Sequence, residues 1–229
     1  VKTVAAYSFP YHDAGGHAVQ ELAFALATAV EHLRQLERRG LGVADVAPRV
    51  LFGFSVGSHF FMEIAKLRAA RMLWARVVDA CDGGESAARM VIHARTSSWN
   101  KTKFDPYVNI LRATSEAFAA VMGGADSLHV GAFDEPLGPP SELGRRIARN
   151  TQIILREECH FDAVVDPAGG SWYVEKLTAE VAEKAWALFQ QVEAAGGMLA
   201  ALSKGIPQRQ VAETAQQRRQ AIAGRREVI

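Results

Sequence analysis

Residues 49–80 read RVLFGFSVGSHFFMEIAKLRAARMLWARVVDA, and this stretch decides the fold class. Its first seven residues form a short apolar run, and from His59 onward apolar side chains recur at helical spacing. A buried strand followed directly by a helix is the pattern of a βα unit, from which parallel sheets are built. We therefore expect an α/β protein.

The same passage from a short β-type run to a longer helical stretch occurs four times along the chain. The expected strands lie at residues 3–8, 49–55, 90–94 and 127–130, and the helices that follow lie at 17–39, 59–80, 106–122 and 141–158. Repeats of ~40 residues in this rhythm favour either half of an eight-stranded, TIM-type (β/α)8 barrel or a small doubly wound sheet. Four units alone cannot close a barrel, so the barrel interpretation predicts a part of a larger domain.

The end of the chain differs in character from the βα repeats. A fifth helix is expected at residues 178–195, before Gly196 and Gly197. The residues beyond it are rich in Gln, Arg and Ala, and Gly205 and Pro207 should break any long helix there. We therefore divide the chain into a half-barrel domain, residues 1–176, and a C-terminal helix with an exposed linker arm, residues 177–229.

The composition is that of an ordinary globular protein and excludes several classes of function. Of the 229 residues, 49% are hydrophobic and 22% are charged, and the formal net charge is +1. Lys and Arg are scattered, so we expect no long-range attraction to nucleic acid or to an anionic membrane. Cys81 and Cys159 suit neither a disulfide framework nor a metal site, and no membrane-spanning run or leader peptide is visible. These features predict a cytoplasmic protein, and a first residue that is not Met and already reads as strand suggests a fragment.

Polar side chains gather where the expected strands end. In a parallel βα architecture, the carboxyl ends of the strands form the functional edge. His12 and Asp13 follow the first strand; a neighbouring carboxylate can orient a histidine as an acid or base, although such a histidine also serves as a cap or surface residue. His93 ends the third strand, and Arg95, followed by the hydroxyl-rich residues 96–98, suits an anion clamp or an ion pair with a nearby carboxylate.

Short motifs narrow the chemistry further. No histidine or cysteine spacing typical of a metal site occurs, and neither a dinucleotide-binding glycine motif nor a P-loop is present. Residues 53–57 read GFSVG and match the G-x-S-x-G pattern, between a strand and a helix as in a nucleophile elbow. Ser55 is therefore a candidate nucleophile of a serine hydrolase, although no acid and histidine stand in a convincing chain order.

A series of sequence blocks resembles the methylmalonyl-CoA mutase family. From residue 48 to residue 198 they read, in order, PRVLFGFSVGSHFFMEIAKLRAARMLWARV, HARTSSWN, DPYVNILR, GGADSLHVGAFDEPLG, RRIARNTQIILREE, VDPAGGSWYVEKLT and EAAGGM. The resemblance covers nearly the whole chain. It implies strands five to eight of the substrate-binding (β/α) barrel, with their helices.

The resemblance also implies a reaction, a cofactor and partners. Enzymes of this family isomerise the carbon skeleton of acyl-CoA substrates of the methylmalonyl-CoA and succinyl-CoA type, using radicals generated from adenosylcobalamin. The implied partners are the acyl-CoA substrate and a homologous mutase subunit or the rest of a parent chain. The D-x-H-x-x-G motif that supplies the lower cobalt ligand is absent from the sequence. Adenosylcobalamin should therefore be bound mainly by a domain outside this chain.

The catalytic residues of the family can be carried over in two ways. In catalytic subunits the fifth strand ends in a Tyr-His pair, whose His contacts the thioester carbonyl. An alignment without gaps gives these places to Phe9 and Pro10, whereas a deletion of two residues gives them to Tyr11 and His12. The ungapped alignment also makes Asp13 a contact of the adenosyl ribose.

The remaining contacts are only partly kept. His93 and Ser97 are retained in a block that reads His-x-Gln-Thr-Ser in catalytic subunits. Arg95 replaces the Gln, and it would either pair with a different acyl carboxylate or plug the pocket. Arg49 matches a coenzyme A contact whose companion Ser is lost, and Glu135 matches an adenosyl contact. The altered set resembles the small subunit of the family more than the catalytic one.

Three functions remain open. The first is that of an acyl-CoA mutase, with this chain in its small subunit or in a divergent paralogue. The second is that of a non-catalytic structural partner that holds a catalytic subunit and binds no ligand. The third is that of a serine hydrolase using Ser55, which the resemblance does not support.

Overall fold

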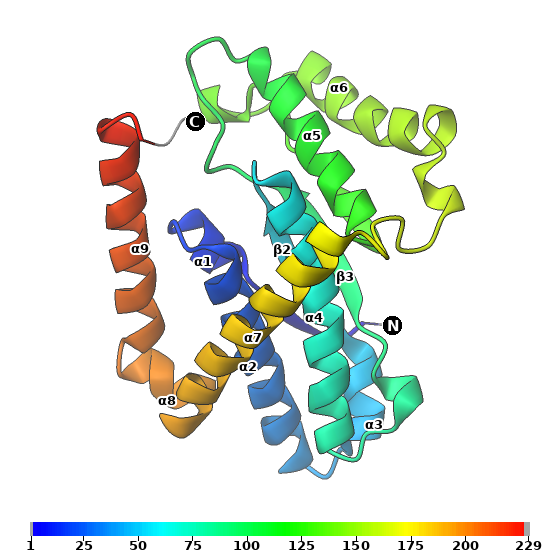
Figure 1. The fold of residues 1–229 in the computed structure, drawn as a ribbon, viewed down its shortest axis with the longest axis vertical. Helices are drawn as coiled ribbons and strands as arrows, with labels where there is room; N and C mark the ends of the chain where they lie inside the picture. Colours follow the sequence, from blue (N-terminus) through cyan, green and yellow to red (C-terminus); the bar gives the residue numbers. More distant parts are fainter. Residues whose placement is uncertain (1, 227–229) are drawn as a thin grey trace.

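The computed structural model describes residues 2–226 and contains a parallel sheet covered by helices (Figure 1). The strands are β1 Val4–Tyr7, β2 Val50–Val56, β3 Val91–Thr96 and β4 Ser127–His129, and they lie in the order β1-β2-β3-β4. Each strand begins and ends within two residues of its predicted position. The prediction of an α/β fold with a parallel sheet is confirmed.

Helices connect the strands and extend beyond them. The longer helices are α2 Ala18–Glu37, α4 Phe60–Ala80, α5 Val108–Met122, α6 Glu142–Ile153, α7 Trp172–Ala194 and α9 Ile206–Ala223. The short helices are α1 Phe9–Asp13, α3 Val43–Val46 and α8 Gly197–Ser203, and the single turns are η1 Ala47–Arg49, η2 Glu85–Ala87, η3 Glu135–Leu137, the π-helical η4 Ile154–Glu158, and η5 Phe161–Ala163.

The sheet is wound in one direction only. Each strand pairs with the strand that follows it in the chain, in parallel. Because right-handed crossovers that always advance the same way put their helices on one face, α2, α4 and α5 share a side, where α2 packs on α4 and α4 on α5. A doubly wound sheet would reverse its strand order, and no reversal occurs among the described residues. Such winding is that of part of a (β/α) barrel, whose closure and strand count stay predictions.

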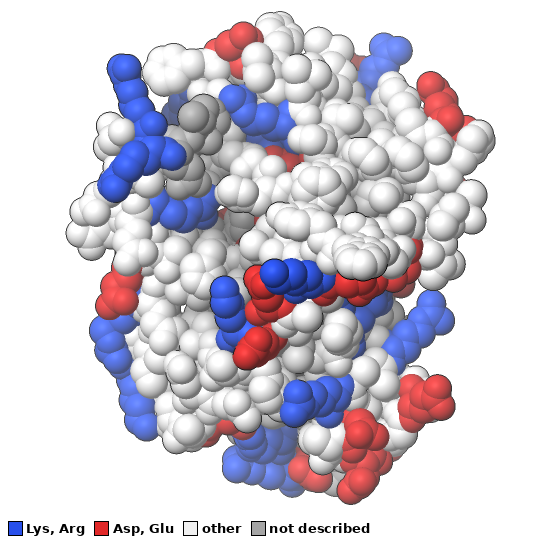
Figure 2. Space-filling model, viewed as in Figure 1, with Lys and Arg blue, Asp and Glu red and all other residues white. Residues whose placement is uncertain are grey.

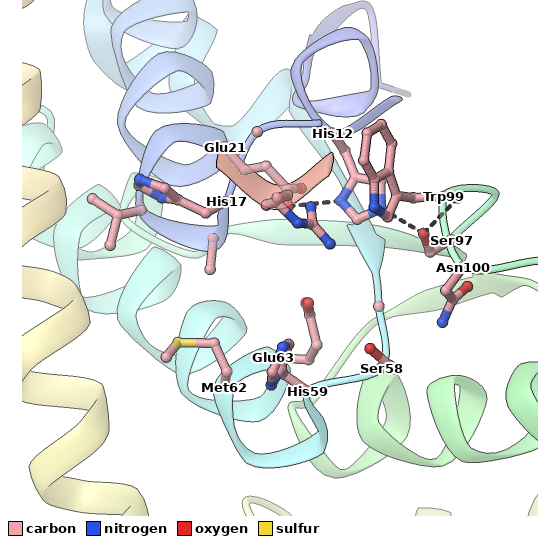
Figure 3. Close-up of a pocket in the computed structure, with 15 residues that line it drawn as sticks. His12, His17, Glu21, Ser58, His59, Met62, Glu63, Ser97, Trp99 and Asn100 are labelled. Carbon is pink, nitrogen blue, oxygen red and sulfur yellow. Dashed lines mark hydrogen bonds and ion pairs between the residues drawn. The ribbon is translucent and has the colours of Figure 1, made fainter. Parts of the chain in front are cut away.

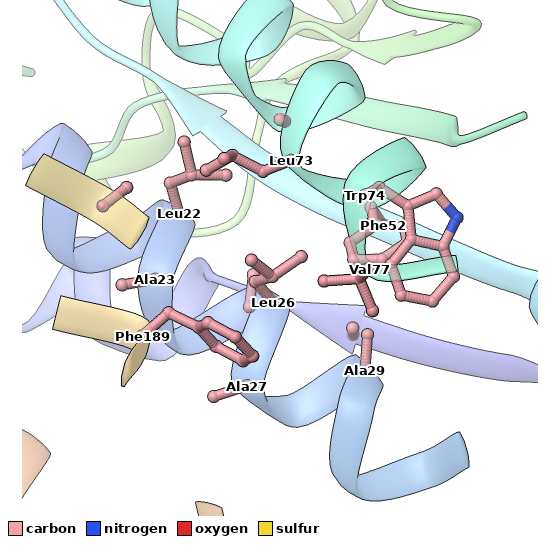
Figure 4. Close-up of a cluster of buried hydrophobic side chains, with 14 of the residues drawn as sticks. Leu22, Ala23, Leu26, Ala27, Ala29, Phe52, Leu73, Trp74, Val77 and Phe189 are labelled. Atoms are coloured by element: carbon pink, nitrogen blue, oxygen red, sulfur yellow. The ribbon is translucent and has the colours of Figure 1, made fainter. Parts of the chain in front are cut away.

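The hydrophobic core lies between the sheet and its helices. Figure 4 shows Phe52 of β2 and Trp74 of α4 together with Leu26 of α2 and Phe189 of α7. The rings of Phe52 and Trp74 are 4.9 Å apart between centroids, and both side chains are fully buried. Burial of each large apolar side chain stabilises the fold by ~1.5–3 kcal/mol, so this layer holds the strand ends in place.

Three segments differ from what the sequence predicts, the first being α7, which begins at Trp172 and not at residue 178. Residues Phe9–Asp13 form the short helix α1 instead of a loop, with Pro10 in the first turn, where it is well tolerated. The residues beyond Gly197 form two helices instead of an exposed arm, and α9 buries Val211 and Ala215. The predicted helix break is found at Gly205, whose φ is +68°. The division at residue 176 stays a prediction; it falls inside α7, which packs on α2 and α4.

Charged side chains of both signs are interspersed on the face of the molecule that Figure 2 shows. Over most of this face, Lys and Arg have Asp and Glu among their neighbours. In the part of the chain that the structure describes, no helix is both long and apolar enough to cross a membrane.

Candidate functional site

The inner face of the sheet, the side turned away from α2, α4 and α5, carries several of the predicted residues. Because side chains alternate along a strand, Gly53 and Ser55 of β2 share this side, while Phe52 and Phe54 face the helices. The strand register puts His93 beside Gly53 and Arg95 beside Ser55. His93 and Arg95 therefore lie together near the carboxyl ends of the strands, as predicted from the sequence.

Phe9 lies over this end of the inner face. Its ring stacks on that of Tyr7 at 5.0 Å and meets the His93 ring edge-on at 6.4 Å, measured between centroids. Gly53 makes this possible because a Cβ atom there would lie only 2.8 Å from Cζ of Phe9 and would also collide with Tyr7. An aromatic side chain without a polar atom thus covers the inner face at this point.

Arg95 is held by three neighbours. Its Nη2 donates to Oδ2 of Asp13, its Nε donates to Oγ of Ser55 at 3.2 Å, and its guanidinium carbon lies 4.1 Å from the centroid of the Phe9 ring. The second oxygen of Asp13 accepts a hydrogen bond from Oγ of Ser98 at 3.2 Å. A charge-assisted hydrogen bond and a cation–π contact both stabilise this position. The charges of Arg95 and Asp13 therefore balance each other, and both carboxylate oxygens are engaged.

His93 provides a neutral imidazole on the inner face. Its Nδ1 lies 2.8 Å from Oγ of Ser127. Partial burial lowers the pKa of His93 below its ordinary value, and the nearby His129 and Arg95 lower it further. The ring is therefore uncharged at pH 7, which suits hydrogen bonding to a polar ligand.

His12, a residue of α1, belongs to a buried polar network in which its ring points toward Glu21 and Ser97 (Figure 3). Its side chain is 5% exposed, with Nδ1 at 2.8 Å from Oε1 of Glu21 and Nε2 at 2.6 Å from Oγ of Ser97. The hydroxyl of Ser8 donates to the other oxygen of Glu21 at 2.9 Å. The structure thus joins the predicted residues His12 and Ser97, but through a contact that the sequence did not indicate.

Tyr11 also faces the helices. Its ring packs against Phe24 of α2, with 4.9 Å between centroids, and burial raises the pKa of its hydroxyl. In the pair Tyr11 and His12, one of the two candidates for the catalytic pair, Tyr11 therefore packs on α2, and His12 bridges Glu21 of α2 and Ser97.

Lys66 of α4 completes the buried network. It is fully buried, and its Nζ lies 2.6 Å from Oε2 of Glu63 and 3.2 Å from Oε1 of Glu21, while it donates to the backbone carbonyl of Ser55 at 2.6 Å. Burial opposes the charge of Lys66, but the two carboxylates outweigh it and raise the pKa. Burial alone would raise the pKa of Glu21, yet Lys66, His12 and Ser8 lower it to about 2.

Neither serine meets the requirements of a hydrolase. The contacts among Ser97, His12 and Glu21 follow the order of a catalytic triad, but Lys66 binds the carboxylate and Ser97 is 2% exposed. The hydroxyl of Ser97 also accepts the backbone N–H of Trp99. Ser55 is fully buried and hydrogen-bonded to Arg95, and no histidine of the described residues hydrogen-bonds to its hydroxyl. The G-x-S-x-G motif at residues 53–57 therefore lacks a histidine that could act as general base on Ser55.

Arg49 lies at the opposite end of the sheet. It precedes β2, its side chain is exposed, and its Nη1 donates to the carbonyl of Asp45 at 2.6 Å. At ~3.3 Å per residue, the strand separates Arg49 from Ser55 by roughly 20 Å. Glu135 follows β4 and lies next to Gly131, where a Cβ atom would be 2.7 Å from its Oε2.

Three charged residues of the buried network were not predicted from the sequence. Glu21, Glu63 and Lys66 lie within helices beside buried apolar residues. A charged residue at such a position needs a charged or hydrogen-bonding partner, and this was the signal available in the sequence. Among residues 2–226, no three His, Cys, Asp or Glu side chains are placed to hold a metal ion.

These features define an α/β protein with a singly wound parallel sheet and polar side chains at the carboxyl ends of its strands. The chain belongs to the methylmalonyl-CoA mutase family, whose sequence profile matches residues 1–229. Relatives that carry this name are isomerases.

Several relatives cover almost the whole chain. It is 48% identical to the methylmalonyl-CoA mutase of Cereibacter sphaeroides over 96% of its length, and 49% identical to the methylmalonyl-CoA mutase small subunit of Streptomyces virginiae over 97%. The large subunit from the same Streptomyces species is 45% identical over 96%. The chain spans only about a third of these relatives, namely 31%, 36% and 30% of their respective lengths. Overall identity does not separate the two subunit types, so the distinction depends on individual residues.

Proposed function

We propose that this chain forms the second half of the substrate-binding barrel in a methylmalonyl-CoA mutase small subunit or a divergent paralogue. In this proposal the chain does not itself supply the catalytic Tyr-His pair. The observation that carries the proposal is the orientation of residues 9–12: Phe9 covers the inner face, whereas Tyr11 and His12 contact α2. This arrangement favours the ungapped alignment, in which Phe9 and Pro10 hold the catalytic places.

The chemistry of these side chains supports the same conclusion. Neither Phe9 nor Pro10 can donate a hydrogen bond to a thioester carbonyl, because Phe has an apolar side chain and Pro lacks even a backbone N–H. Arg95 is paired with Asp13 and packed on Phe9, which favours a plugged pocket over the capture of an acyl carboxylate. A partner subunit with a different set of inner-face residues would then carry out the isomerisation. Relatives named as small and large subunits support such a pairing.

The contact with adenosylcobalamin that the resemblance assigns to Asp13 would share a carboxylate that is already engaged. One of its oxygens accepts from Arg95 and the other from Ser98. Each oxygen keeps a second acceptor site for a ribose hydroxyl, and the side chain is partly exposed. Glu135 stays a predicted contact, and dependence of the assembled enzyme on the cofactor is part of the proposal.

An acyl-CoA ligand would have to lie along the inner face. Coenzyme A thioesters carry phosphates at one end and the acyl group at the other, joined by a long flexible arm. Such a molecule can reach from Arg49, at the amino end of β2, to the carboxyl end roughly 20 Å away. Since Arg49 is exposed, its guanidinium is accessible to phosphate.

The proposal is tested by substituting the inner face in the assembled enzyme. Phe9→Leu and Arg95→Gln should leave turnover within about twofold of the unmodified enzyme, because no bond-making step depends on them. Ser115→Ala, on the exposed side of α5, serves as the control. A loss of ~100-fold in either variant, with assembly unchanged by sedimentation, would assign catalysis to this chain.

A substitution of Arg49 distinguishes a chain that still binds acyl-CoA from a purely structural partner that does not. If the full-length protein binds acyl-CoA through this chain, Arg49→Ala should weaken binding about tenfold, the value of a charge-assisted contact of ~1.5 kcal/mol. Isothermal titration with succinyl-CoA measures the affinity, with Arg39→Ala, at an exposed position just beyond α2, as the matched control. Equal affinities of the Arg49 and Arg39 variants would support a structural partner that holds no ligand here.

A further inference from the structure

A cavity of about 280 Å³ lies at the carboxyl ends of the strands, separate from the inner face and beyond the proposed function. Figure 3 shows His12 and Glu21 on one side of it, with Met62 and Glu63 across from them. Trp99 also lines this cavity. Glu21 and Glu63 are both buried, so the cavity has acidic side chains in its wall. Another part of the chain lies over its opening.

That covering part is α9, which runs past α1 on one side of the molecule (Figure 1). Gln20 of α2 donates through Nε2 to the carbonyl of Gln210 and to Oγ1 of Thr214, each at 3.0 Å. Ala215 packs against Gly15 so closely that a Cβ atom on the glycine would lie 2.7 Å from that of Ala215. These contacts fix α9 above the loop between α1 and α2.

Arg218 extends from α9 to the cavity. It lines the cavity together with Trp99, and its guanidinium carbon lies 4.9 Å from the centroid of the Trp99 ring. The guanidinium gains from the cation–π contact with the Trp99 ring. Arg218 therefore forms part of the cavity wall and joins α9 to it.

The attachment of α9 is small compared with that of α7. Its buried side chains are Pro207, Val211 and Ala215, whereas α7 buries larger ones such as Phe189. The segment begins at Gly205, whose φ of +68° lies in the left-handed region that glycine adopts without strain. Elements with few buried apolar contacts open at a lower free energy than the core does.

We propose that α9 is a lid that opens by rotation at Gly205 and controls access to the cavity beneath it. Gln20, Thr214 and Arg218 hold the lid closed. Opening exposes Trp99 and the carboxylate of Glu63 while the sheet, α2 and α7 stay folded. The lid does not depend on which subunit type this chain represents.

Hydrogen–deuterium exchange of the full-length protein, read by mass spectrometry, tests the proposal. The amides of residues 206–223 should exchange faster than those of α7 in the unmodified protein. Arg218→Gln and Thr214→Val should each speed their exchange about fivefold, the effect of losing one contact of ~1 kcal/mol. Residues 97–100, on the cavity wall, should become less protected in the same variants, and α7 should not change.

Arg219→Gln is the matched control, because it removes the same charge from the neighbouring, exposed position of the same helix. It should leave the exchange of residues 206–223 unaltered. The proposal is overturned if α9 exchanges as slowly as α7 and neither lid variant changes it. It is equally overturned if α2 and α7 lose protection together with α9, since the helix would then be part of the core.

Discussion

At the scale of single residues, the buried network around Lys66 dominates the energetics of the candidate site. Three ionisable side chains are buried there: Glu21, Glu63 and Lys66. Nζ of Lys66 lies within 3.2 Å of a carboxylate oxygen of each glutamate. Removing one partner of such a network leaves an uncompensated charge in a poorly hydrated place. The network therefore fixes α2 and α4 relative to the strand ends and makes a structural role for His12 the natural one.

Lys66→Met should lower the free energy of unfolding by about 3–5 kcal/mol, because Glu21 and Glu63 would lose their counter-charge. Urea unfolding at pH 7 measures the change. Lys184→Met, at an exposed position of α7, is the control and should change stability by less than ~0.5 kcal/mol. Equal stabilities of the two variants would mean that the buried charges contribute nothing to the fold.

The pH dependence of stability should carry the signature of Glu21. Its pKa in the folded protein is about 2, below the ordinary value of 4.5, so the folded state favours the carboxylate. This stabilisation is fully present above pH ~4.5 and is lost as the pH falls toward 2. Urea unfolding between pH 5.5 and 2.5 should show a steeper loss for the unmodified protein than for Glu21→Gln. Parallel curves would contradict the assigned contacts.

The polar residues that follow the expected strands in the sequence were enough to predict part of the candidate site. His93, Arg95 and Asp13 come together because the carboxyl ends of parallel strands meet at one edge. The orientation of His12 could not be predicted, since it depends on the turn of helix α1, which is too short to show a periodic pattern. Partners far apart in sequence, such as Glu21 and Lys66, require the packing of α2 on α4 to be known.

At the scale of elements, the close approach of Phe9 to the sheet depends on Gly53. Gly53→Ala should destabilise the protein by about 1–3 kcal/mol, because the added methyl group overlaps the rings of Tyr7 and Phe9. Thermal unfolding measures it against Gly42→Ala, where the nearest atom, Oδ2 of Asp45, would be 3.8 Å away. Equal melting temperatures would show that Phe9 is not fixed over the inner face.

Strands and long helices followed from the sequence because their apolar periodicity repeats over many residues. The expected helix at residues 59–80 is found as α4, Phe60–Ala80, and the expected strand at 127–130 as β4, Ser127–His129. The C-terminal helices were harder to predict, since α9 has only a narrow apolar stripe and packs through small side chains. Its position on Gly15 is a tertiary contact that local sequence does not encode.

At the scale of the whole molecule, the sheet formed by residues 2–226 has two free edges, and α2, α4 and α5 cover only one of its faces. β1 and β4 each pair with one neighbour only in the described part of the chain, and exposed parallel edges are costly in water. Because the chain spans about a third of its relatives' length, the missing strands would come from the rest of a longer protein. Barrel closure by those strands would enclose Phe9, His93 and Arg95.

If this chain does not supply the catalytic histidine, His12→Gln should leave the assembled enzyme active. Glutamine keeps hydrogen-bonding groups toward Glu21 and Ser97, so assembly with the partner can be checked by sedimentation before turnover is measured. We predict turnover within about twofold of the unmodified enzyme, because both ring nitrogens of the buried His12 are engaged, one by Glu21 of α2 and one by Ser97. A loss of ~100-fold with normal assembly would contradict the account and make His12 the donor to the thioester carbonyl.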